Sequence, residues 1–98
     1  MAIYLNWMEF SQTIKGDLVP TEGNPVADHL VLTSGVASTV APVGAQYASV
    51  WSTAAATVAV SDLGGKLGEN KTYALPANVV LQIPNIVVNS STITVTDI

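Results

Sequence analysis

Thr92-Ile93-Thr94-Val95-Thr96 is the stretch of sequence that decides the fold class. Apolar and polar residues alternate strictly in it, so Ile93 and Val95 point to one side of an extended chain and the three threonines to the other. All five side chains are β-branched, and such residues suit a pleated, half-buried surface. The stretch therefore predicts a β-strand with one face in a core and one face in solvent.

The same period of two recurs along the chain. In residues 46–52, Tyr47, Ser49 and Trp51 alternate with Ala48, Val50 and Ser52, and Thr57-Val58-Ala59-Val60-Ser61 repeats the pattern. Turn-forming Gly, Pro, Asn and Asp residues separate such runs at intervals of roughly 8–12 residues, which is typical of sandwiches and small barrels. We predict strands at residues 29–33, 36–41, 45–52, 55–61, 71–75, 79–84 and 91–97. The predicted fold is all-β: a small antiparallel β-sandwich or jelly-roll-like barrel with an extended N-terminal arm.

The first 28 residues differ in kind from the rest, and we predict an arm and linker over residues 1–28 and a β-sandwich domain over residues 29–98. The linker part, residues 15–28, is polar and contains Gly16, Pro20, Gly23 and Pro25. Large apolar groups on such an arm favour contact with a neighbouring subunit, by addition of a strand to its sheet. The predicted interaction residues are Ile3, Tyr4, Leu5, Trp7, Met8 and Phe10. The alternative is an ordinary first strand of the chain's own sandwich.

Composition favours a protein that is buried among other proteins. Hydrophobic residues make up 49% of the 98 residues and charged residues 10%, whereas about 25% charged residues is usual. No cysteine is present, so neither disulfides nor thiolate metal ligands stabilise so small a core. A monomer with so few charges is poorly protected against association. We therefore expect burial in an assembly, with a Thr/Ser-rich secreted surface domain as the alternative.

The charge balance excludes several classes of partner. Lys15, Lys66 and Lys71 are the only basic residues, and the net charge is −4. Nucleic acids and anionic membrane surfaces require clustered Lys and Arg, so neither is an expected partner. No apolar run approaches the ~18 residues of a membrane span, and the first residues lack the basic start of a signal peptide. We expect a protein that is made in a cytoplasm.

No motif in the chain predicts catalysis. His29 follows Asp28, but adjacent strand residues point to opposite faces, which favours a surface or interface histidine. The acidic residues lack the spacing of a calcium loop, and Gly64-Gly65-Lys66-Leu67-Gly68 lacks the pattern of a phosphate-binding loop and favours a hairpin. We predict that the protein is not an enzyme and has no catalytic, cofactor-binding or metal-binding residues.

Tyr47 and Trp51 are the best candidates for a ligand platform. They fall on the same side of one predicted strand, and two aromatic rings on one face suit the flat face of a sugar. The alternative is that Trp51 belongs to the sandwich core and covers the alanines at residues 54–56.

Residues 36–98 carry a resemblance to a known group of proteins. A strand, a Pro-x-Gly turn at Pro42-Val43-Gly44 and an aromatic strand through Trp51 are followed by Ala56-Thr57-Val58-Ala59-Val60 and a Gly-rich loop. Tyr73-Ala74-Leu75-Pro76-Ala77-Asn78, residues 79–84 and Thr92-Ile93-Thr94-Val95 complete the pattern. In this order of elements the chain resembles the small β-sandwich virion proteins of tailed bacteriophages, of the capsid decoration (cement) or head-fibre type.

The resemblance implies a structural role without catalysis. It implies a capsid decoration subunit that binds the major capsid protein and other virion proteins and stabilises the shell, on the capsid surface of the virion, after synthesis in the host cytoplasm. It also implies a homo-oligomer, a trimer or a dimer. Similar sandwiches occur in tail accessory or fibre proteins and in carbohydrate-binding modules, which are the alternative functions.

Overall fold

The computed structural model describes residues 2–12, 18–63 and 69–98, and within them it contains only strands, turns and irregular segments. The eight strands are β1 (Ile3–Gln12), β2 (Leu18–Pro25), β3 (Leu30–Leu32), β4 (Tyr47–Ser52), β5 (Ala56–Leu63), β6 (Glu69–Leu75), β7 (Leu81–Ile83) and β8 (Ile93–Asp97). Across the described ranges, no helix is long and apolar enough to cross a membrane. The predicted all-β fold is confirmed.

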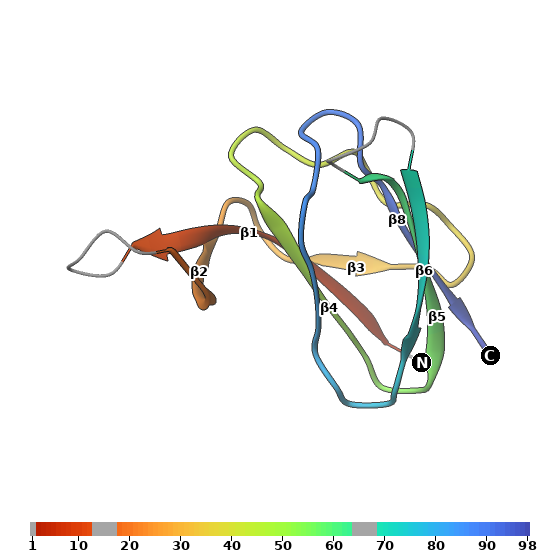
Figure 1. Ribbon diagram of the computed structural model, residues 1–98. Coiled ribbons are helices and arrows are strands. Elements are labelled where there is room, and N and C mark those ends of the chain that lie inside the picture. The colour runs from red at the N-terminus through yellow and green to blue at the C-terminus, as the bar shows by residue number, and fades with distance from the viewer. Residues whose placement is uncertain (1, 13–17, 64–68) are drawn as a thin grey trace.

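The strands form two antiparallel sheets (Figure 1). The larger sheet has the order β2-β1-β4-β7, and β3 also pairs with β1. The smaller sheet has the order β6-β5-β8. Six of the predicted strands, those near residues 29–33, 45–52, 55–61, 71–75, 79–84 and 91–97, correspond to β3, β4, β5, β6, β7 and β8.

The core lies between the inner faces of the two sheets, and alternation along the strands selects its members. Ile93 and Val95 of β8 are both fully buried, as their alternation with threonines predicts. The other buried apolar residues of the cluster come from β1, β4, β5, β6, β7 and the loop before β4. They are Ile3, Leu5, Trp7, Ala41, Ala45, Ala48, Val50, Ala56, Val58, Val60, Leu75 and Ile83.

The N-terminal segment is a strand of the chain's own sandwich. Residues 3–8 pair with β4 along one edge, and residues 3–5 pair with β3 along the other. Ile3, Leu5 and Trp7 are no more than 2% exposed and belong to the core, so their prediction as contacts for a neighbour is wrong. The reason is that β1 is a central strand, and the apolar side of a central strand is covered by the opposite sheet. The division predicted at residue 28 therefore does not separate residues 3–8 from the sandwich.

The remaining predicted contact residues have different environments. Tyr4 lies on the outer face of the larger sheet, Met8 is half-buried, and the side chain of Phe10 is outside the described part of the structure. The end of β1 pairs with β2, through Met8 with Pro25 and Gln12 with Leu18. This hairpin extends away from the two packed sheets (Figure 1). The segment predicted as linker thus contains β2, which its own polar sequence did not indicate.

The strand predicted at residues 36–41 does not form. One isolated bridge joins Ala37 to Thr94, and the rest of this segment follows the edge of β8 irregularly. The backbone N–H of Ser38 donates to the carbonyl of Ile93, while the N–H of Ile93 donates to Oγ of Ser38. The N–H of Asp97 likewise donates to Oγ of Ser34. Serine oxygens replace carbonyl acceptors here, so residues 34–41 cover the β8 edge without being a regular strand.

Turns form at several of the Gly, Pro and Asn positions that separate the predicted strands. Gly35 and Gly44 have φ of 79° and 94°, values that glycine adopts readily, and Asn78 and Asn89 have φ of 60° and 62°. Asn is the residue besides Gly that best tolerates this left-handed region. The hairpin predicted around Gly64-Gly65-Lys66-Leu67-Gly68 lies outside the described residues.

Candidate binding site

The outer face of the larger sheet carries aromatic side chains that strand register brings together. Tyr4 on β1 is opposite Val31 of β3 on one side and opposite Trp51 of β4 on the other. Because side chains alternate along β1, Tyr4 and Asn6 point outward while Ile3, Leu5 and Trp7 point into the core. The three paired positions form one row across three strands.

Tyr4 lies between two other rings. Its ring centroid is 5.0 Å from that of Trp51 with an interplanar angle of 25°, a stacked arrangement. The centroid of the His29 ring is 6.3 Å away on a plane tilted by 56°. Such aromatic pairs contribute about 0.5–1.5 kcal/mol beyond the burial of their area. The stack orders the two larger rings on an otherwise solvent-facing sheet.

A cavity of about 390 Å³ is lined by Tyr4, Asn6, His29 and Trp51. Tyr4, Asn6 and Trp51 are half-buried and His29 is exposed, so the cavity opens to solvent. The rings supply apolar surface, and the amide, imidazole, hydroxyl and indole N–H groups supply hydrogen-bond donors and acceptors. None of the four side chains carries a fixed charge. The arrangement suits a neutral ligand with an apolar face and a polar rim.

Of the two residues predicted as a ligand platform, Tyr47 and Trp51, only Trp51 lines the cavity. Trp51 lies on the outer face and not in the core, so the interpretation of Trp51 as a core anchor is wrong. Tyr47 points to the same side of β4, but it is only 2% exposed and does not line the cavity. It lies opposite Met8, which also pairs with Pro25 at the base of the β1–β2 hairpin. The ring that stacks on Trp51 is that of Tyr4, which lies on β1, 47 positions earlier in the sequence.

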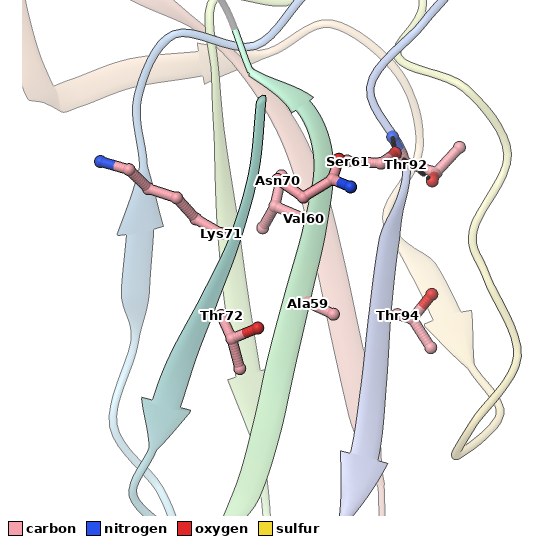
Figure 2. A pocket seen from close by; sticks show the side chains of 8 residues that line it. All are labelled: Ala59, Val60, Ser61, Asn70, Lys71, Thr72, Thr92 and Thr94. Carbon is pink, nitrogen blue, oxygen red and sulfur yellow. Dashed lines mark hydrogen bonds between the residues drawn. The ribbon is translucent and has the colours of Figure 1, made fainter. Parts of the chain in front are cut away.

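A second, smaller hollow lies on the outer face of the smaller sheet (Figure 2). It has a volume of about 170 Å³ and is lined mostly by short polar side chains around Ala59. The hydroxyls of Ser61 and Thr92 are 2.7 Å apart and hydrogen-bonded to each other, and the side chain of Lys71 points away from them (Figure 2). Its described lining residues supply neither an aromatic ring nor a convergent charge, so we interpret this hollow as the ordinary polar face of a half-buried sheet.

The described residues contain no cluster of three or more His, Asp or Glu side chains placed to hold a metal ion. His29 is exposed, and its ring lies beside that of Tyr4. Comparison of the chain with protein-family models, with curated proteins and with solved structures finds no match.

Proposed function

We propose that this protein is a structural subunit of a tailed-phage virion, a capsid decoration protein that binds the major capsid protein and stabilises the shell. The order of β elements in residues 36–98 resembles such proteins, and the low charge favours burial among other subunits. Its role is contact without catalysis. Binding of many copies to the assembled shell, and not to its free subunits, stabilises the shell by mass action. A dimer or trimer at a symmetry axis fits this role.

The observation that carries the proposal is the apolar surface of the segment that covers the β8 edge. Val36, Val40 and Val43 are 56%, 45% and 80% exposed, and all three belong to the single stretch between β3 and β4. Exposed apolar side chains that recur along one segment support a role of this segment in protein–protein contact. We name these three residues the valine segment, and it replaces the N-terminal strand as the expected contact with the capsid.

Substitution of all three residues of the valine segment by serine is expected to weaken binding to capsid shells at least about tenfold. Burying one valine contributes about 1.5 kcal/mol or more, and about 1.4 kcal/mol corresponds to a tenfold change in affinity. The measurement is co-sedimentation with shells assembled from the major capsid protein of the phage that encodes the chain. Fold stability should change little, because the three side chains are exposed.

The matched control replaces three valines that are exposed elsewhere, Val31, Val79 and Val80. It should bind shells as the unmodified protein does. Equal binding by both triple variants and the unmodified protein would contradict the role of the valine segment. Binding of the unmodified protein to isolated tails, but not to shells, would instead identify a tail accessory or fibre subunit.

A further inference from the structure

We infer that the cavity bordered by Tyr4, Asn6, His29 and Trp51 is a binding site for a neutral saccharide. This site lies on the outer face of the larger sheet, while the valine segment follows the edge of the smaller sheet. Saccharide recognition is thus a function separate from attachment to the capsid, and each can be tested without the other.

The size of the cavity suits one or two sugar rings. Its volume of about 390 Å³ lies within the range of about 300–1,000 Å³ found for small-molecule sites. Three of its four lining residues are aromatic, and a pyranose ring has an apolar C–H face that packs on such rings. The stack of Tyr4 on Trp51 holds both rings in place before a ligand arrives, which lowers the entropy lost on binding.

The polar atoms around the cavity are free to bind hydroxyl groups. Among the described residues, the side chains of Tyr4, Asn6, His29 and Trp51 make no hydrogen bond to the rest of the protein. The Asn6 amide both donates and accepts, and so does the neutral imidazole of His29. A sugar hydroxyl has the same double character, so it can both donate to and accept from either of these groups.

The charges of the molecule select neutral sugars over acidic ones. Among the described residues, no lysine lines the cavity, and Asp28 precedes His29 in the chain. The net charge of −4 adds a weak repulsion for anions. A uronic or sialic acid would find no Arg or Lys partner for its carboxylate among the described residues that line the cavity. The ligand class is therefore a neutral pyranose oligosaccharide.

The test is a titration of the full chain with maltotetraose, cellotetraose, mannotetraose and chitotetraose, followed by amide chemical-shift changes in two-dimensional NMR spectra. At least one of the four should perturb the amides of Tyr4, Asn6, His29 and Trp51 together at concentrations up to about 10 mM, since shallow sites bind with millimolar to micromolar Kd. Sialic acid should not. If none of the four oligosaccharides perturbs these residues, the site is not a saccharide site.

Two variants assign the binding to this cavity. Trp51→Ala should weaken binding at least about tenfold, and His29→Ala about 2–10-fold, the effect of one lost hydrogen bond. Thr94→Ala in the hollow of the smaller sheet is the control and should bind normally. Because His29 is exposed, we expect His29→Ala to stay folded. Its affinity therefore tests whether the saccharide binds in this cavity even if Trp51→Ala does not fold. Unchanged affinity in His29→Ala and Trp51→Ala would overturn the assignment, whereas the triple variant of the valine segment should bind sugar normally.

Discussion

Trp7→Ala is expected to lower the free energy of unfolding by about 3–5 kcal/mol, the usual cost of deleting a large aromatic side chain from a core. Trp7 is 2% exposed and belongs to the core cluster between the sheets. A domain of this size has a total stability of about 5–15 kcal/mol, so the variant is close to unfolding. Urea denaturation followed by far-ultraviolet circular dichroism measures the difference.

Trp51→Ala is the matched control, because it removes the same side chain from the outer face of the same sheet. Its expected cost is about 1–2 kcal/mol, from the lost stack on Tyr4 and partial burial. Trp7→Phe should lower the free energy of unfolding less than Trp7→Ala. Nε1 of Trp7 is buried with no hydrogen-bond partner among the described residues, so its removal breaks no hydrogen bond, and phenylalanine keeps an aromatic ring in the core. Equal stability of Trp7→Ala and the unmodified protein would mean that residues 3–7 form an arm outside the core.

Ser91→Ala is expected to destabilise the protein by about 2–4 kcal/mol, a large effect for the loss of one oxygen atom. The Ser91 hydroxyl donates to the carbonyl of Asp62 at 2.9 Å and accepts from the N–H of Val87 at 2.9 Å. Ser91 is fully buried, so water does not replace the lost hydroxyl, and each unpaired group costs about 1–3 kcal/mol. Thermal and urea unfolding of the variant measure the loss.

Ser90→Ala provides the comparison from the neighbouring position. Ser90 donates one hydrogen bond of 3.0 Å to the carboxylate of Asp62 and is only half-buried. Because water can reach that carboxylate, we expect a loss below about 1 kcal/mol. Equal losses in the two variants would show that the Ser91 hydroxyl does not join the turn before β8 to the end of β5.

The strands that were predicted best are those in which apolar and polar residues alternate. In the run through Ile93 and Val95, apolar and polar residues alternate. Only an extended strand places all the apolar side chains of such a run on one side. β2 was missed because its polar sequence contains Pro20, Gly23 and Pro25, and the strand exists through its pairing with β1. Residues 36–41 include Val36, Thr39 and Val40, β-branched residues that favour a strand, but Ser34 and Ser38 use side-chain oxygens in place of a regular ladder.

The candidate site was predicted only in part for a related reason. Alternation within one strand showed that Tyr47 and Trp51 share a side, but it did not show which positions of that side are covered. Tyr47 is buried beside the base of the β1–β2 hairpin, while Trp51 remains half-exposed. Both outcomes depend on neighbours that are distant in the sequence.

The period of two in the sequence determined by itself that this chain forms strands and which side chains of each strand lie together. That follows because successive side chains of an extended backbone point in opposite directions. Only the tertiary structure decided that β1 is a central strand and that Tyr4 lies beside Trp51 and His29. Register is set by the packing of both sheets at once, and a shift of one residue would turn Tyr4 toward the core and leave Leu5 in solvent.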